Sequence, residues 1–204
     1  MARTGRPRNF DRDEAVAKAM HLFWQYGYEG TSLEQLRHAM GDISSASFYA
    51  AFGSKEALYR ETLVEYLRTH GKVVTALRDE HLPPRDRLEQ ALRRSAAMQT
   101  ASAHPTGCMV ALSATICSEG GASAQAVTAA ERKANREAIA ACVKAGVEEG
   151  ILRPDTDVAG LAALYEGLLV GLSIQARDGV AGKSIDAAIT QAMKAWDASC
   201  KATS

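Results

Sequence analysis

Apolar residues recur every three or four positions along almost the whole chain, and the alternation typical of β-strands is hard to find. The sequence therefore predicts an all-α fold. Glycine, proline and capping residues divide it into about nine helices. These predicted helices cover approximately 11–26, 32–40, 45–52, 55–78, 85–101, 108–117, 123–149, 157–178 and 184–199.

The segment from 31 to 52 carries the clearest local signals. Thr31 or Ser32 is suited to cap a short helix, and a glutamate or glutamine lies three residues beyond either one, which is the spacing of a capping box. Gly41 supplies a turn, and Ser44 is suited to cap the next short helix. Two short helices joined by a tight glycine turn form a helix-turn-helix unit.

The charge is balanced overall but uneven along the chain. The 204 residues carry 24 basic and 24 acidic side chains, so bulk attraction to nucleic acid is excluded. The first dozen residues nevertheless hold Arg3, Arg6, Arg8 and Arg12, and Pro7 disfavours a helix there. This segment is either a cationic arm that lies along phosphates or enters a minor groove, or a solubilising tail.

Cysteine use and hydropathy indicate a cytoplasmic protein. Cys108, Cys117, Cys142 and Cys200 form no CxxC pair, which suits a reducing compartment and predicts neither a disulfide framework nor a metal site. They are expected to be small buried residues, and a thiol sensor at Cys108 or Cys117 is the alternative. No apolar run reaches the roughly 18 residues that a membrane span needs, and the N-terminus has no apolar signal-peptide stretch.

A dense motif lies between positions 27 and 58. It consists of Gly27, Tyr28, Thr31, Ser32, Leu33, Ser44, Ala46, Phe48, Tyr49, Phe52, Ser54, Lys55 and Leu58. In these residues the chain resembles the TetR/AcrR family of bacterial regulators. The resemblance implies an N-terminal basic arm and three-helix helix-turn-helix domain at 1–54. It also implies a larger helical domain for effector binding and dimerisation at 55–204.

The resemblance and the docking geometry of recognition helices together indicate which residues contact DNA. They are Arg3, Arg6, Arg8, Thr31, Arg37, Ser44, Ser45, Ala46, Tyr49, Ala50 and Lys55. Leu33, Leu36, Phe48 and Phe52 are expected to form the core of the small domain. One departure from the family pattern is an extra residue in the turn, Asp42 after Gly41. Its carboxylate would be repelled by phosphates unless it points away or caps a helix.

The second half of the chain has wide apolar helical faces, and two glycines four residues apart permit close approach of helices. The resemblance implies that the last two helices pair with their copies in a homodimer, while burial within the monomer is the alternative. The expected dimer residues are Leu164, Gly167, Leu168, Gly171, Leu172, Ile189, Met193 and Trp196. The expected effector-site residues, for each of which a core role is the alternative, are Met98, Met109, Leu112, Ile116, Cys117 and Tyr165.

The sequence and the resemblance therefore predict a dimeric repressor that binds a palindromic double-stranded operator. A small-molecule effector of unknown identity is expected to release it. No cofactor is expected. Catalysis is disfavoured because the five histidines are dispersed without a metal-binding or catalytic pairing. The alternative is a helical adaptor that does not bind DNA.

Overall fold

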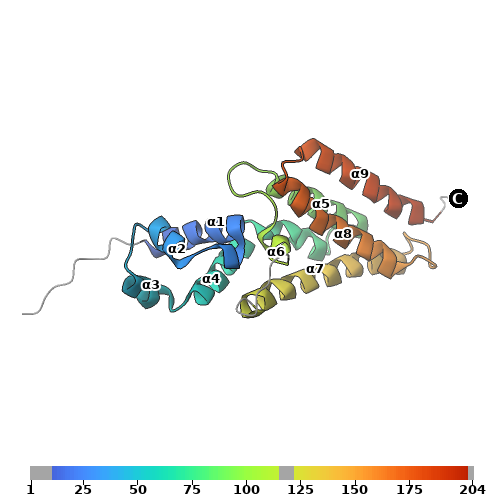
Figure 1. Cartoon of the computed structure of the whole chain (residues 1–204). Coiled ribbons are helices and arrows are strands. Elements are labelled where there is room, and N and C mark those ends of the chain that lie inside the picture. The colour runs from blue at the N-terminus through green and yellow to red at the C-terminus, as the bar shows by residue number, and fades with distance from the viewer. Residues whose placement is uncertain (1–10, 115–121, 202–204) are drawn as a thin grey trace, which may run out of the picture.

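The computed structural model describes residues 11–114 and 122–201, and within these ranges it contains nine α-helices, one 3₁₀ helix and no strand. The prediction of an all-α fold is confirmed. Helices α1 to α4 form one end of the molecule, and α5, α7, α8 and α9 form the helical body at the other end (Figure 1). The elements are α1 (Arg12–Gly30), α2 (Leu33–Ala39), α3 (Ser45–Phe52), α4 (Lys55–Thr69), η1 (Gly71–Arg78), α5 (Pro84–Gln99), α6 (Met109–Leu112), α7 (Ala122–Glu148), α8 (Val158–Arg177) and α9 (Gly182–Ser199).

Each of the first four helices begins at a polar side chain that satisfies free backbone N–H groups. Asp11, Ser44 and Ser54 accept such bonds at the starts of α1, α3 and α4. Ser32 caps α2 and forms a reciprocal capping box with Gln35, so the structure chooses between the alternatives that the sequence left open. Caps of this kind stabilise a helix by about 1 kcal/mol each, which matters most for α2 and α3 because they are so short.

Two predicted helices differ from those observed. The predicted helix at 55–78 ends at Thr69, and η1 continues the chain as a 3₁₀ helix. Val73, Val74 and Thr75 lie in this segment, and β-branched side chains disfavour a regular α-helix. The predicted helix at 108–117 is also shorter, because α6 ends at Leu112 and is followed by a turn at 113–114. Positions 115–117 lie outside the described residues.

The buried apolar side chains form two clusters. The first joins α1, α2, α3 and α4 around Phe23, Leu36 and Phe48, and it also takes Met109 and Val110 from α6. The second joins η1, α5, α7, α8 and α9. Because α6 contributes to the first cluster and packs on α7 and α8, the two ends of the molecule share buried side chains.

Trp24 ties the end of α1 to the helical body. Its indole Nε1 donates a hydrogen bond to the Gly107 carbonyl at 3.0 Å, and its ring stacks on His104 with centroids 4.5 Å apart. From α8, the Arg177 guanidinium donates to the Trp24 carbonyl at 2.8 Å. Gly107 has φ of 81°, and a Cβ there would lie 2.9 Å from the Ser173 carbonyl oxygen, so this loop needs glycine.

Histidines around this junction predict loss of stability in acid. Burial lowers the pKa of His70 and of His21, and the charge of His104 acts in the same direction. In the unfolded chain the pKa of histidine is about 6.5. As the pH falls below neutral, the unfolded chain therefore binds more protons than the folded chain. The free energy of unfolding should therefore decrease as the pH falls from about 7.5 to about 5.5.

His70→Gln tests this assignment, with urea unfolding at both pH values as the measurement. We expect the variant to lose less stability between the two pH values than the wild type, because one of the titrating groups is gone. His81, which is exposed in the turn before α5, provides the control His81→Gln. Carboxylates titrate equally in all three proteins, so identical pH dependence in all of them would contradict the role of His70.

Candidate functional site

The turn between α2 and α3 is held by two side chains of α2. Gly41 and Asp42 both have left-handed backbone conformations, with φ of 86° and 57°. The Arg37 Nε donates to the Ile43 carbonyl at 2.7 Å, and His38 Nδ1 lies 2.8 Å from the Asp42 carboxylate. Part of the Arg37 guanidinium therefore holds the turn, a role that the sequence pattern does not indicate.

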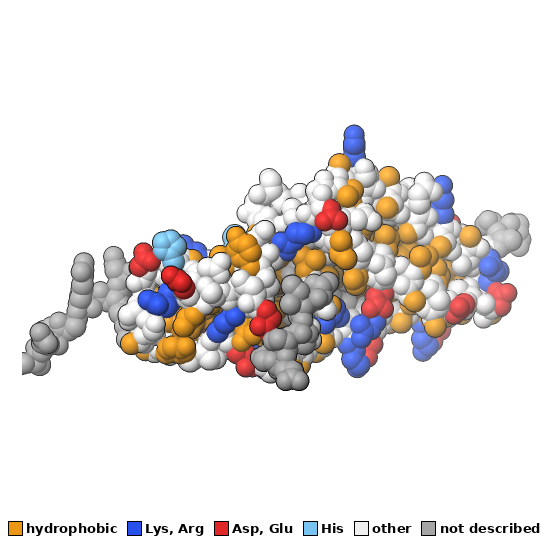
Figure 2. Space-filling view, viewed as in Figure 1, with side chains coloured by type: hydrophobic (Ala, Val, Ile, Leu, Met, Phe, Trp, Pro, Cys, Tyr) orange, Lys and Arg blue, Asp and Glu red, His pale blue; other side chains and the backbone are white. Residues whose placement is uncertain are grey.

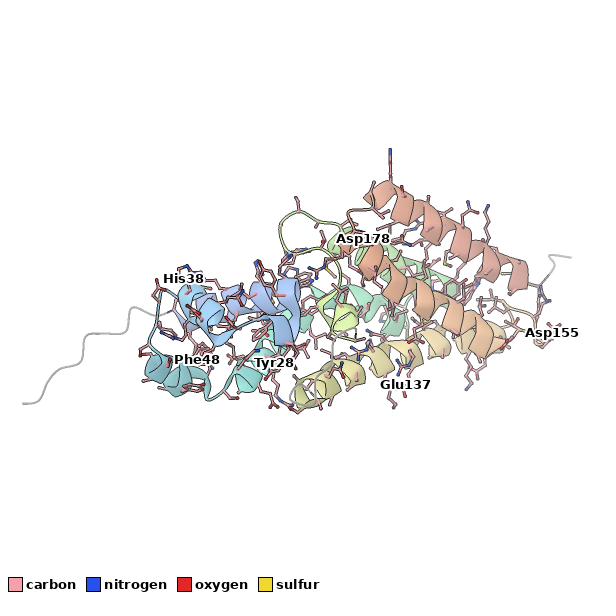
Figure 3. The ribbon with its side chains drawn as sticks, viewed as in Figure 1. Tyr28, His38, Phe48, Glu137, Asp155 and Asp178 are labelled. Atoms are coloured by element: carbon pink, nitrogen blue, oxygen red, sulfur yellow. The ribbon has the colours of Figure 1, made fainter. Side chains whose placement is uncertain are left out.

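Helix α3 has one buried and one exposed face. Phe48 is fully buried and Phe52 almost so, which confirms the predicted core. In Figure 3, Phe48 lies on the inner side of α3, whereas His38 projects from the outer side of α2. The exposed face carries Ser45, Ala46, Tyr49 and Ala50, and Tyr49 is 51% exposed. A face of small side chains with one projecting phenol can enter a groove closely, because little bulk stands between the helix backbone and a base edge.

Two hydroxyl groups that were predicted to contact DNA have other partners. Thr31 is completely buried, and its Oγ1 donates to carbonyls at the end of α1, at 2.7 Å to Gly27 and 3.2 Å to Leu22. The predicted phosphate contact of the Thr31 side chain is therefore wrong. Ser44 Oγ accepts from the Ser47 backbone N–H and donates to the Ser47 hydroxyl, so its first task is to cap α3.

Lys55 lies at the start of α4, against an aromatic ring. Its Nζ is 4.4 Å from the centroid of the Tyr28 ring, a cation–π contact. Burial lowers the pKa of this ammonium group. The contact holds the charge beside the recognition helix. Arg3, Arg6 and Arg8 of the predicted arm lie outside the described residues.

A partly open cavity of about 60 Å³ lies between α4, η1, α5, α6, α7 and α8. Among the predicted effector residues, Met98 lines it. Tyr165 does not, because its hydroxyl donates to the Ala192 carbonyl of α9, and Met109 is buried in the first cluster instead. Leu112 lines separate hollows nearer to α1. Ile116 and Cys117 lie outside the described residues.

The cysteines differ in their surroundings. Cys108 is half-buried beside the cavity, and its Sγ accepts a hydrogen bond from the Tyr66 hydroxyl at 3.3 Å. Burial raises the pKa of the Cys142 thiol to about 11, so this group stays protonated at neutral pH. Cys142 therefore behaves as a small core residue, as the sequence suggested.

Helix α8 carries an uncovered apolar face. Leu164 is 47% exposed and Ile174 is 50% exposed, and a Cβ added at Gly167 or Gly171 would meet nothing within 4 Å. Figure 2 shows hydrophobic side chains gathered over this part of the molecule. By length and composition alone α8 could cross a membrane, but its other face packs on α7 and α9 in the second cluster. A partly covered helix of this kind fits a protein interface.

Four residues predicted for the dimer surface are buried within the monomer instead. They are Leu172, Ile189, Met193 and Trp196. The inner face of α9 is required to cover α5 and α8, so its apolar residues belong to the second cluster. Among the predicted dimer residues, Leu164, Gly167, Leu168 and Gly171 remain at least partly exposed.

A capped short helix that follows a glycine turn, joined to a helical body with a cavity, is the arrangement of a helix-turn-helix regulator. Comparisons with known proteins agree. The model of bacterial regulatory proteins of the tetR family matches residues 15–62. The HTH-type transcriptional repressor ComR of Escherichia coli (strain K12) is 30% identical over 193 residues, which cover 94% of this chain and 91% of ComR.

Further relatives extend the match. The E. coli repressor BdcR is 36% identical over 107 residues, covering 52% of this chain and 53% of BdcR. A cysteine mutant of the TetR family regulator CifR, solved with 26-base-pair operator DNA, is 39% identical with a TM-score of 0.84, covering 94% of this chain and 100% of that one. The chain therefore belongs to the TetR family of DNA-binding transcriptional regulators.

The buried position of Thr31 leads to a stability prediction. Thr31→Val removes the hydroxyl that pairs with the Gly27 carbonyl and should lower the free energy of unfolding by about 1–3 kcal/mol, measured by urea denaturation. Thr31→Ser keeps the hydroxyl and should lose less. Both variants should retain DNA affinity when folded. If Thr31→Val is as stable as the wild type but binds DNA more weakly, the result would support a phosphate contact of Thr31 instead.

Proposed function

We propose that this protein is a transcriptional repressor that binds a palindromic operator as a homodimer and is released by a small-molecule effector. The observation that carries the proposal is the exposed face of α3, held from behind by buried Phe48 and Phe52. The repressor names of ComR and BdcR and the operator complex of CifR support it. We place the protein in the cytoplasm, as a regulator rather than an enzyme.

In the proposed complex α3 enters the major groove. Ser45, Ala46 and Ala50 face base edges, and the Tyr49 hydroxyl donates to a phosphate. Residues 44–52 include no arginine, lysine, asparagine or glutamine, the residue types that read bases bidentately. Specificity in one half-site is therefore modest, and two half-sites about one helical turn apart are needed for selective binding. Arg3, Arg6 and Arg8 would add contacts to the backbone or minor groove.

The division of tasks follows the two clusters. We assign DNA binding to residues 1–54 and effector binding and dimerisation to residues 55–204, with α4 packed on both sides of the boundary. Leu164 and Leu168 meet their copies where glycines allow close approach of two α8 helices. An effector opposes DNA binding only if the protein has two states, one that binds the effector more tightly and one that binds DNA more tightly. This coupling is reciprocal, so bound DNA weakens effector binding by the same factor.

Selection from random duplexes tests the proposal. The purified protein is titrated with a pool of random double-stranded DNA by fluorescence anisotropy at several salt concentrations, and the retained DNA is sequenced. We expect enrichment of a palindrome and a steep decrease of affinity with salt, because phosphate contacts release counterions. If neither is observed, the adaptor function becomes the better explanation.

The extra turn residue predicts a gain of affinity on charge removal. Asp42→Asn removes a carboxylate beside the DNA-binding helix, and asparagine tolerates the left-handed conformation of this position. We expect operator binding to tighten by about two- to fivefold at low salt, and by less at high salt. Asp155→Asn changes an exposed carboxylate at the far end of the molecule (Figure 3) and serves as the control. Equal affinity in both variants would show that the turn does not face phosphates.

The exposed face of α8 predicts that a charge placed on it disrupts the dimer. Leu164→Glu should convert the dimer to a monomer at micromolar concentration, measured by sedimentation equilibrium, because two unpaired carboxylates would be buried at the interface. Far-ultraviolet circular dichroism should not change, since Leu164 is 47% exposed in the monomer. Val64→Glu introduces the same charge at an even more exposed apolar position on α4 and should leave the dimer intact. If the Leu164→Glu variant remains a dimer, the interface does not include Leu164.

A further inference from the structure

Gln99 lines the cavity and carries an unpaired polar atom. The residue is 1% exposed and lines the cavity, and its Nε2 donates to Ser95 Oγ at 2.8 Å. Its Oε1 is buried and has no hydrogen-bond partner among the described residues. Leaving a buried amide oxygen unpaired destabilises a protein, so such groups need a partner. A molecule in the cavity can supply one.

The orientation of the amide does not alter this conclusion. If the Gln99 side chain is turned over, Oε1 accepts from the Ser95 hydroxyl and Nε2 becomes the unpaired atom. A hydroxyl group suits both arrangements, because it can donate to Oε1 or accept from Nε2. The wall of the cavity is largely apolar, and Met98, Ile139 and Leu169 are among its residues.

Two of the charged groups at the cavity, Arg132 and Glu166, already have partners. Arg132 donates from Nη1 to the Val110 carbonyl at 2.7 Å and to the Ser113 hydroxyl at 2.9 Å. Glu166 pairs with Arg136 at 3.3 Å, and the lining also includes Glu131 and Asn135. Lining carboxylates and guanidinium groups are thus mixed, and no single sign of charge dominates. An ionised ligand would bring a charge without a matching partner, which is costly in a largely apolar site.

We infer that the cavity takes a compact, uncharged, mostly apolar molecule with one hydroxyl group, such as a small phenol or alcohol, and that this hydroxyl pairs with the Gln99 amide. The inference rests on the proposed function, because it names the chemical class of its effector. The cavity, at about 60 Å³, exceeds the space that a single buried water needs.

Gln99 also lies next to the junction with the DNA-binding end. Its backbone carbonyl accepts from the Gly107 N–H at 2.9 Å, and the Gly107 carbonyl accepts from Trp24 Nε1 at 3.0 Å. Two consecutive hydrogen bonds therefore join the wall of the cavity to α1. An occupant that moves the end of α5 is placed to shift the Gly107 loop, and with it the position of Trp24.

Binding of phenol, toluene and benzoate to the full-length protein tests the inference by titration calorimetry. Phenol and toluene are similar in size and differ in the hydroxyl, and benzoate adds a charge. In Gln99→Leu we expect phenol to bind about two- to tenfold more weakly, while toluene binds equally well or more tightly. Benzoate should bind the wild type more weakly than phenol does. Gln90→Leu makes the same change on α5 outside the cavity and should alter neither ratio.

Operator binding is measured on the same samples with and without phenol. Phenol should weaken operator binding of the wild type and of Gln90→Leu, and should have less effect on Gln99→Leu. An unchanged ratio of phenol to toluene affinity in Gln99→Leu, tighter binding of benzoate, or binding of none of the three probes would overturn the inference. Operator binding without any probe reports on the proposed function separately, since its loss in the wild type would refute that function whatever the probes do.

Discussion

The hydrogen bond from Trp24 to the Gly107 carbonyl is the contact on which the two ends of this molecule depend. The indole is buried, so an unpaired N–H would be destabilising, and the loop that supplies its acceptor requires glycine at position 107. Arg177 holds the same turn of α1 from α8. The orientation of the DNA-binding helices relative to the helical body is therefore set by polar contacts with few geometric alternatives.

The DNA-binding end is rigid for a different reason. Helices α2 and α3 are too short to be stable alone, and they are held by side-chain caps and by aromatic residues packed on α1 and α4. Thr31, Arg37 and Ser44 all take part in this scaffold. Polar residues near a recognition helix thus serve the fold before they serve the ligand. The exposed strip that remains, with Tyr49 at its centre, is narrow, which makes cooperation between two half-sites important.

Helix α8 combines three tasks on its faces. One side covers α7 and α9 in the core, a second lines the cavity through Leu169 and Val170, and a third is apolar and exposed around Leu164. An occupant of the cavity would touch the helix that we assign to the dimer interface. Arg177 at its C-terminal end holds α1. The same helix therefore contacts the cavity, the proposed interface and the DNA-binding end.

Local patterns in the sequence determined the all-α fold, the helix-turn-helix and the buried role of Phe48 and Phe52, because helix periodicity, caps and glycine turns act over a few residues. The tertiary structure decided which apolar face is covered and which hydroxyl is already occupied. Ile189, Met193 and Trp196 have the same pattern as a dimer face, yet they are buried because α5 and α8 need a cover. Thr31 and Gln99 look like ordinary polar residues in the sequence. Only the folded chain shows that one is satisfied by carbonyls of α1 and that the other lines a cavity, since both outcomes depend on neighbours distant in sequence.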